Sequence, residues 1–296
     1  MSSDASTPET DTDAVTGGTP ADYGTLYVVG IGPGLPEHMT AKAKRVIESA
    51  DVVIASSLYQ AFLREDGTLP PEDTVDDDGI ATRASGFEQE IVRSTMGRQI
   101  ELARAAFEYV REGKDVAHVS GGDPSVYGKS DLLFTMAERE DATDVPIEIV
   151  PGLTAALGGA ANVGAPLCND FCTISLSDKW RGWDEIEEKL RAAAISDFVI
   201  VLYNCWRNYE QAVEIVREER TDDALVAIVN DAGREDAGRN GESEFITTLG
   251  EAADHDDRVS GMGTSLIIGT HETKTWRNDD RTYLVTPRGG RDVEDF

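Results

Sequence analysis

The residue types best suited to hold a ligand lie in the stretch 120–128, where Gly121 and Gly122 precede Asp123. Glycines let a ligand approach the backbone because they have no Cβ, and a carboxylate accepts hydrogen bonds from hydroxyl or ammonium groups. The apolar run 116–119 predicts a buried strand before this loop, and the residues after it predict a helix. Ligands of open α/β sheets bind where strands end, so we interpret the stretch as a binding loop, with an ordinary strand-to-helix turn as the alternative.

Two further loops that contain glycine follow predicted strands. Residues 30–34, Gly-Ile-Gly-Pro-Gly, follow the apolar run 25–29, and residues 151–155 follow the apolar run 145–150. The carboxyl ends of parallel strands lie along one edge of a sheet, so the three loops can line one cleft. The first loop lacks the third glycine of the dinucleotide fingerprint, and no Gly-Lys-Ser/Thr follows it. Both facts argue against a nicotinamide site or a P-loop.

The elements predicted around these loops alternate in the first half of the chain and are mainly strands in the second half. The first half predicts strands at 25–29, 52–55, 116–119 and 145–150 and helices at 39–50, 87–112, 129–139 and 153–163. The second half predicts strands at 171–176, 197–203, 225–229, 244–249 and 265–269 and helices at 183–194 and 209–219. We therefore expect an α/β protein of two domains, 25–155 with a mostly parallel sheet and 156–290 with a mixed sheet. Residues 1–24 are predicted to form a disordered acidic tail and 291–296 a second tail.

The charge balance restricts the partners of the chain. It has 27 basic against 56 acidic residues, a net charge of −29, and only seven lysines. Such a surface suits high salt, where a Debye length of ~3 Å at 1 M screens the self-repulsion, so we predict a halophilic protein. No basic stripe is available to meet phosphates, which argues against a nucleic-acid partner. No apolar run is long enough for a transmembrane helix, and the N-terminus lacks the features of a signal peptide.

The cysteines and histidines predict neither a metal site nor a catalytic set. Cys168, Cys172 and Cys205 are an odd and sparse set, which favours a reducing cytoplasm without structural disulfides. The spacing of Cys168 and Cys172 suggests a metal, but no nearby His or second Cys pair completes a zinc set, so small buried thiols are the better interpretation. His118 lies inside a predicted strand and is interpreted as a satisfied core residue. No residue is assigned a catalytic role.

The order of the motifs resembles that of the tetrapyrrole methyltransferases, the S-adenosylmethionine-dependent enzymes of corrin and siroheme synthesis. The resemblance rests on the stretches 29–34, 122–128 and 150–155 and covers about residues 25 to 290. Five further stretches make it more similar to the branch that methylates carbon 17 of precorrin-3B with ring contraction. They are 164–178, 183–186, 203–204, 233–235 and 286–290.

The resemblance implies two α/β domains, a homodimer, and S-adenosylmethionine folded into a cleft between the domains. Matched by position, it implies a set of cofactor-binding residues, of which Pro33 lies by the substrate trough. They are Pro33, Gly122, Asp123, Val126, Tyr127, Thr154, Ala155, Tyr203, Asn204, Ile228 and Thr264. A corrinoid substrate carries many carboxylates, so cations near the motifs are substrate candidates, with ordinary surface charge as the alternative. The substrate set is Gly32, Gly34, Lys129, Asp178, Arg207 and Arg288, with Lys179 and Arg181 as further cations.

Several positions depart from the pattern of the family, mainly on the substrate side. The usual Tyr-Asn-Pro-x-Ser is here Tyr203 to Arg207 with Cys205 and Trp206 inside, and a common His is replaced by Asn169. These departures leave three alternatives open: methylation at another corrin ring position, methylation of diphthine, or a non-catalytic tetrapyrrole-binding protein. The sequence does not distinguish a cobalt-containing from a metal-free substrate.

Overall fold

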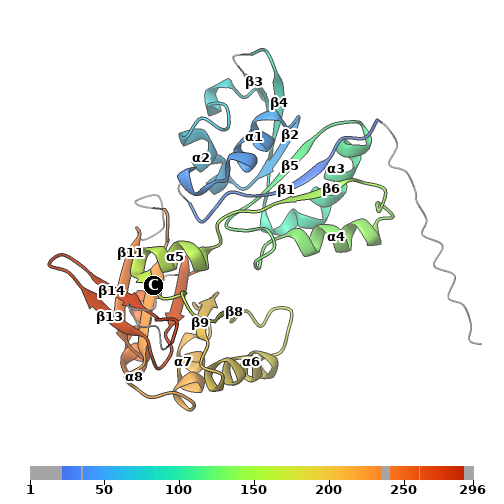
Figure 1. Cartoon of the computed structure of the whole chain (residues 1–296). Helices are drawn as coiled ribbons and strands as arrows, with labels where there is room; N and C mark the ends of the chain where they lie inside the picture. Colours follow the sequence, from blue (N-terminus) through green and yellow to red (C-terminus); the bar gives the residue numbers. More distant parts are fainter. Residues whose placement is uncertain (1–21, 35, 84, 235–240, 260, 290–296) are drawn as a thin grey trace, which may run out of the picture.

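The computed structural model describes residues 22–289 except 35, 84, 235–240 and 260, and it folds them into two α/β domains (Figure 1). The predicted tail 291–296 and nearly all of the predicted tail 1–24 lie outside the described residues. One domain contains a mostly parallel sheet and the other a mixed sheet, which confirms the predicted fold class. No helix of the described ranges is long and apolar enough to cross a membrane.

The first sheet has six strands in the order β3-β4-β2-β5-β1-β6. They are β1 (Leu26–Gly30), β2 (Val52–Ala55), β3 (Ile80–Thr82), β4 (Glu88–Arg93), β5 (Val116–Ser120) and β6 (Ile147–Val150). Only β3 and β4 pair antiparallel. Parallel sheets are normally covered on both faces, because their crossover connections place helices there. Here α3 (Gln99–Arg111) and α4 (Ser130–Arg139) cover one face, and α1 (Ala41–Ser49) and α2 (Ser57–Glu65) cover the other.

Local sequence explains how these layers form. Side chains alternate along a strand, so Val28 packs in the cluster under α3 and α4 while Val29 packs in the cluster under α1. The helix α1 begins where predicted, because the Thr40 hydroxyl accepts a hydrogen bond from the Ala43 N–H at 3.1 Å.

The single helix predicted over 87–112 is wrong at its N-terminal end. Residues Glu88–Arg93 form β4, a 3-10 turn follows at Met96–Arg98, and the helix α3 begins only at Gln99. The strand holds because the side chain of Gln89 is fully buried and donates hydrogen bonds to the carbonyls of Ile47 and Ala50 at 2.8 and 2.7 Å. A polar residue satisfied by distant backbone groups in this way leaves no periodic signal in the sequence.

The second sheet has five strands in the order β11-β10-β12-β9-β8. They are β8 (Phe171–Ser175), β9 (Val199–Tyr203), β10 (Leu225–Asn230), β11 (Ser243–Thr248) and β12 (Thr264–Ile268). Only β8 and β9 are parallel. The helices α6 (Trp183–Ile195), α7 (Tyr209–Arg217) and α8 (Leu249–Ala252) pack on one face, and α5 (Ala155–Val163) packs on the other.

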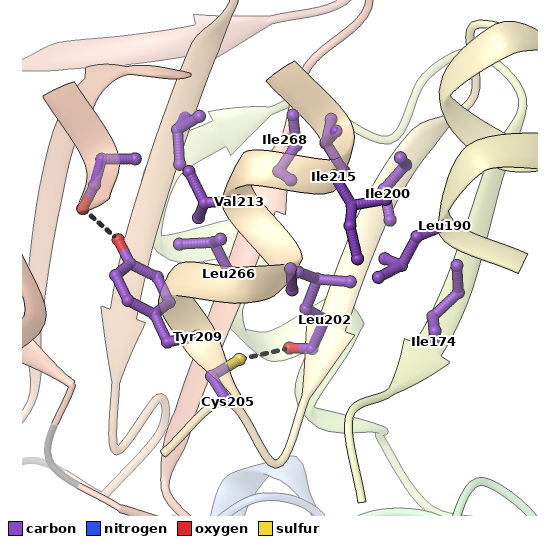
Figure 2. Packing of buried hydrophobic residues seen from close by; sticks show 14 of the residues in the cluster. Ile174, Leu190, Ile200, Leu202, Cys205, Tyr209, Val213, Ile215, Leu266 and Ile268 are labelled. Atoms are coloured by element: carbon purple, nitrogen blue, oxygen red, sulfur yellow. Dashed lines mark hydrogen bonds between the residues drawn. The ribbon is translucent and has the colours of Figure 1, made fainter. Parts of the chain in front are cut away.

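Figure 2 shows the core beneath α7, in which Val213 and Ile215 meet side chains of β9 and β12. Two buried polar groups at its edge are satisfied by backbone carbonyls. The Cys205 thiol donates to the Leu202 carbonyl at 3.3 Å, and the Tyr209 hydroxyl donates to the Ala252 carbonyl at 2.6 Å. Burial raises the pKa of Cys205 to about 12, so this thiol stays protonated and packs as part of the core.

The other cysteines correct the prediction that they are small buried thiols. Cys168 is exposed and Cys172 is half-buried, because both lie where the chain enters the edge strand β8. All three cysteines are free. No group of three His, Cys, Asp or Glu side chains in the described residues is arranged to hold a metal ion.

A third sheet was not predicted. Its three strands, in the order β13-β14-β7, are β7 (Gly164–Ala165), β13 (Lys274–Arg277) and β14 (Thr282–Val285). The hairpin of β13 and β14 extends beside the second sheet, and β14 pairs in parallel with β7, directly after α5 (Figure 1). β7 has only two residues, and β13, Lys-Thr-Trp-Arg, is exposed along its whole length, so neither contains an apolar run of the kind that predicts a strand.

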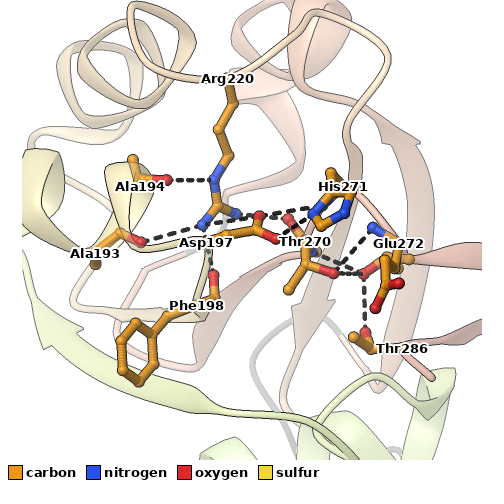
Figure 3. A network of polar contacts seen from close by, with 11 residues as sticks. Ala193, Ala194, Asp197, Phe198, Arg220, Thr270, His271, Glu272 and Thr286 are labelled. Atoms are coloured by element: carbon orange, nitrogen blue, oxygen red, sulfur yellow. Dashed lines mark hydrogen bonds and ion pairs between the residues drawn. The ribbon is translucent and has the colours of Figure 1, made fainter. Parts of the chain in front are cut away.

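A buried arginine joins the helical face of the second domain to its sheet. The side chain of Arg220 is 5% exposed. Its guanidinium donates to the carbonyls of Ala193, Ala194, Phe198 and Gly269, at 3.2, 3.3, 2.6 and 2.6 Å (Figure 3). The Asp197 carboxylate lies 3.9 Å away and also contacts the ring of His271. One cation therefore links acceptors from three separate segments. The carbonyls of Ala193 and Ala194 also accept from the N–H groups of Phe198 and Asp197, each at 3.2 Å.

Candidate functional site

The three predicted loops meet at the carboxyl edge of the first sheet, because β5, β1 and β6 are adjacent parallel strands. Gly32 and Gly122 exchange two backbone hydrogen bonds, of 3.2 and 2.7 Å. A Cβ on Gly152 would lie 2.3 Å from the Gly122 carbonyl, so the third loop approaches the second as closely as only glycine permits. The prediction that these loops share one edge is confirmed.

Asp123 ties two of these loops together. One carboxylate oxygen accepts from the Ser125 N–H at 2.8 Å, and the other accepts from the Gly152 N–H at 3.0 Å. Asp123 does not cap the following helix, because α4 begins at Ser130 and its N-cap residue is Lys129. Asp123 thus fixes the distance between the second and the third loop.

Tyr203, the last residue of β9, connects the second domain to the same loops. Its hydroxyl lies 2.6 Å from the Thr154 hydroxyl and accepts from the Ala156 N–H at 2.7 Å, in the first turn of α5. Its ring centroid is 5.1 Å from that of Tyr127, whose hydroxyl donates to the Thr173 carbonyl of β8 at 2.8 Å. Burial raises the pKa of Tyr203, so the hydroxyl stays protonated. Four predicted cofactor residues are therefore grouped: Tyr127, Thr154, Ala155 and Tyr203.

Pro33 is held by a residue that the sequence reasoning did not select. The Arg234 guanidinium donates to the Pro33 carbonyl at 2.8 Å and to the Asp231 carboxylate at 2.9 Å. This contact joins the first loop to the end of β10, across 201 residues of sequence. The stretch 233–235 contributed only to the resemblance, and a contact over that separation gives no local signal.

The remaining predicted cofactor residues are more dispersed. Asn204 follows Tyr203 and donates to the Ser175 hydroxyl at 2.9 Å, at the end of β8. The side chain of Ile228 packs in the core that faces α6 and α7, on the side of the sheet opposite α5. Thr264 is buried and donates to the Asn230 side-chain oxygen at 2.6 Å. The structure therefore does not bring the Ile228 side chain to the loops, and the ligand roles of all three residues stay predictions.

The predicted substrate residues other than Lys129 fall into three places. Gly32 and Gly34 lie in the first loop beside Pro33. Asp178 and Arg207 lie in the loops that follow β8 and β9, at the same strand ends as Tyr203. Arg288 follows β14, and its guanidinium lies 3.4 Å from the Cys168 carbonyl.

Lys129 is partly enclosed behind the binding loop. Its ammonium group lies 3.4 Å from the Val119 carbonyl, and burial lowers the pKa of Lys129 from 10.5 to about 8. Its neighbour His118 is 1% exposed, and burial, followed by the charge of Lys129, lowers the pKa of His118 to about 3. His118 is therefore a neutral core residue as expected. It is not fully satisfied, because its Nδ1 has no hydrogen-bond partner among the described residues.

We expect Lys129→Met to stabilise the protein at pH 7 by ~1–3 kcal/mol, since a methionine avoids burying the charge. The folded-state pKa is about 8, below the unfolded value of 10.5, so the unfolded chain binds more protons between them. Wild-type stability should then rise with pH across this window, and the advantage of the variant should vanish by its upper end. Denaturant unfolding at several pH values measures this. The exposed Lys274→Met is the control, and an equal pH slope in wild type and Lys129→Met would contradict the expectation.

Comparison with known proteins identifies the family of the chain. The family model of the tetrapyrrole (corrin/porphyrin) methylases matches residues 25–253. The chain belongs to this family. Among curated relatives, the cobalamin biosynthesis protein CbiHC of Archaeoglobus fulgidus is 37% identical over 271 residues, which are 90% of this chain and 53% of the relative. The precorrin-3B C(17)-methyltransferase of Sinorhizobium sp is 36% identical over 274 residues, which are 90% of this chain and 96% of the relative.

A solved structure has the same fold as this tetrapyrrole methylase. The crystal structure of the methyltransferase CobJ superposes with a TM-score of 0.73 at 27% identity, covering 89% of this chain and all of that one. The chain spans only about half the length of some curated relatives, among them CbiHC, and nearly the whole length of others. The three loops and the facing end of β9 therefore belong to a methylase fold.

Proposed function

We propose that this tetrapyrrole methylase transfers a methyl group from S-adenosylmethionine to carbon 17 of precorrin-3B, or of its cobalt form, with ring contraction in cobalamin biosynthesis. The observation that carries the proposal is the match over nearly the full length of relatives named for this reaction, at 32–36% identity. The joined loops 30–34, 120–128 and 151–155, facing Tyr203, supply the place for the cofactor.

The loops fit such a cofactor in one respect that the geometry shows. Gly122 has a φ of +68°, and a Cβ placed there would meet nothing closer than 3.9 Å. The atoms at that distance belong to residues 153–155 at the start of α5. Bare backbone is thus presented between Asp123, Tyr127 and Thr154, where the methionine and ribose portions can be held. Val126 and Ala155 complete the cofactor set that we propose.

The chemistry needs little covalent help from the chain. S-adenosylmethionine supplies a methyl group on a sulfonium, which a nucleophilic carbon displaces in line. The residues have to position both reactants and exclude water. Asp123 and Tyr203 do so by fixing the loops and the first turn of α5. Gly32, Pro33 and Gly34 lie on the side that Arg234 holds, where we place the macrocycle. This arrangement accounts for the absence of an assigned catalytic acid or base.

We propose in addition that the protein is a cytoplasmic homodimer adapted to high salt. The net charge of −29 and the seven lysines support the salt adaptation, and the free cysteines support a reducing compartment. A protein of this charge should melt at a lower temperature in low salt than in molar salt. Light scattering in molar salt measures the assembly state.

Titration calorimetry with S-adenosylhomocysteine in molar salt tests cofactor binding, and we expect saturable binding without added metal.

Incubation with labelled S-adenosylmethionine and precorrin-3B or its cobalt form tests the reaction. A product of the mass and spectrum of the ring-contracted, carbon 17-methylated corrinoid is expected. Binding without turnover would favour a tetrapyrrole-binding protein, and a product methylated elsewhere would favour another ring position. Failure to bind S-adenosylhomocysteine would reject the proposed function.

A further inference from the structure

Two exposed tryptophans lie in the loops that follow β8 and β9, each with a cation over its ring. Trp180 is 88% exposed and Trp206 is 45% exposed. The Lys179 ammonium lies 4.7 Å from the ring centroid of Trp180, and the Arg207 guanidinium carbon lies 4.3 Å from that of Trp206. Their ring faces are open to solvent, so they are available to stack on a flat partner.

The two tryptophans come from loops that leave the same edge of the second sheet. β8 and β9 are parallel neighbours, and Ser175 lies opposite Tyr203 at their carboxyl ends. The loops are joined directly, because the Asn208 side chain donates to the Leu176 carbonyl at 3.1 Å. Trp206 follows Tyr203 by three residues. Trp206 is therefore close in sequence to Tyr203, which contacts Tyr127 and Thr154, and the loop that carries Trp180 begins at the adjoining strand end.

The cations of these loops have no carboxylate partner. In the described ranges no carboxylate lies within 4.0 Å of the charged groups of Lys179, Arg181 or Arg207, a state that they share with other cations such as Arg45 and Lys274. What distinguishes the three is their position. The Arg181 guanidinium donates to the Ser175 carbonyl, which holds it at the end of β8. In a chain with acidic residues in twofold excess, three cations in two joined loops provide charge for an anionic ligand.

We propose that Trp180 and Trp206, with Lys179, Arg181 and Arg207, form the docking platform for the tetrapyrrole, the indoles against the face of the macrocycle and the cations on its carboxylates. This inference rests on the proposed function and names how its substrate is recognised. Aromatic faces stack on a flat, conjugated ring, and guanidinium groups hold carboxylates in bidentate pairs. In molar salt, a Debye length of ~3 Å removes long-range attraction, so direct ring contact becomes the more durable part of recognition.

The platform also gives a role to a departure from the family pattern. Trp206 and Arg207 stand where the family usually has x-Ser after Tyr-Asn-Pro. Trp206 occupies the variable position of that pattern and Arg207 replaces its serine, so the departure adds a cation to the loop directly after Tyr203. We interpret Arg207 as a contact to a substrate carboxylate.

Uroporphyrin, a flat tetrapyrrole with eight carboxylates, is the probe, and its fluorescence anisotropy in molar salt gives the dissociation constant. Trp180→Ala and Trp206→Ala should each weaken its binding about tenfold, and Trp206→Phe should retain most of it. The matched control is Trp276→Ala, which removes a ring that is 54% exposed in β13 and carries no cation. Lys179→Gln and Arg207→Gln should weaken uroporphyrin binding, and Lys274→Gln should not. With precorrin-3B, the two Ala variants should raise KM more than they lower kcat.

Binding of S-adenosylhomocysteine is measured on the same preparations and separates the two proposals. Unchanged affinity for it, with tenfold weaker uroporphyrin binding in the platform variants, supports the platform. If the wild-type protein binds S-adenosylhomocysteine but either fails to bind uroporphyrin or binds it equally well after Trp180→Ala and Trp206→Ala, the platform is wrong and the proposed function stands. If the wild-type protein does not bind S-adenosylhomocysteine, the proposed function itself fails.

Discussion

Asp123→Ala should weaken the binding of S-adenosylhomocysteine by about ten- to a hundredfold and lower the melting temperature as well. The carboxylate accepts hydrogen bonds from the N–H groups of Ser125 and Gly152, at 2.8 and 3.0 Å, and the substitution leaves both donors without a partner. Hydrogen bonds to a charged acceptor contribute about 1.5–3 kcal/mol each. A loss of that size raises the dissociation constant by about ten- to a hundredfold. The loops that form the site would separate.

The comparison of Asp123→Asn with Asp123→Ala distinguishes a loop tie from a direct contact with the cofactor. An asparagine keeps one acceptor for one of the two N–H groups, so it should lose less stability than alanine. Asp131→Ala is the control, because Asp131 is an exposed acidic residue in the first turn of α4. Calorimetry and thermal unfolding of the same samples provide both readouts. An unchanged dissociation constant in Asp123→Ala would reject our placement of the cofactor.

Arg220→Met should destabilise the second domain by about 3–5 kcal/mol, the cost typical of breaking a buried charged network. The guanidinium satisfies four carbonyls from the end of α6, the start of β9 and the end of β12. A methionine fills similar space but donates nothing, so the carbonyls of Phe198 and Gly269 lose this donor in a buried region, while those of Ala193 and Ala194 keep a backbone N–H partner. Guanidinium chloride unfolding gives the free energy directly, and a melting temperature lower by roughly 10 °C is expected for a domain of this size.

Two variants make the test specific to the geometry of Arg220. Arg220→Lys should recover only part of the stability, because one ammonium cannot reach acceptors arranged around a planar fork. Arg217→Met removes a neighbouring surface arginine that pairs with Glu214 and Asp222, and exposed pairs of this kind contribute only about 0–1 kcal/mol. Equal costs for Arg220→Met and Arg217→Met would show that the buried network does not hold these segments together.

The sequence was sufficient to predict features that depend on residues close together in the chain. Glycine loops after apolar runs predicted the edge at which loops 30–34, 120–128 and 151–155 meet, because a strand followed by a turn is read over ten residues. The contacts that complete the site are not local. Tyr203 reaches Thr154 across 49 residues, and Arg234 reaches Pro33 across 201. Nothing in the composition of either segment identifies the other, so only the fold reveals these pairs.

The wrong prediction of a helix at the start of 87–112 has the same explanation. Residues 87–98 carry acids and a glutamine that match a helical surface, but the pairing of β4 with β2 and the burial of Gln89 decide the outcome. Tertiary contacts override local preference most readily where the preference is weak. The cations and tryptophans of the loops after β8 and β9 have no fixed spacing, so the sequence contains no pattern that groups them.

The pairing of β14 with β7 imposes an order on the assembly of the chain during synthesis. All six strands of the first sheet lie before residue 151, so that sheet can close once this part has left the ribosome. The parallel partner of Gly164–Ala165 is not made until residues 284–285 have been added. Until then β7 has no strand beside it, and long-range pairings of this kind form slowly. The first domain can thus fold before the strands of the second domain are complete.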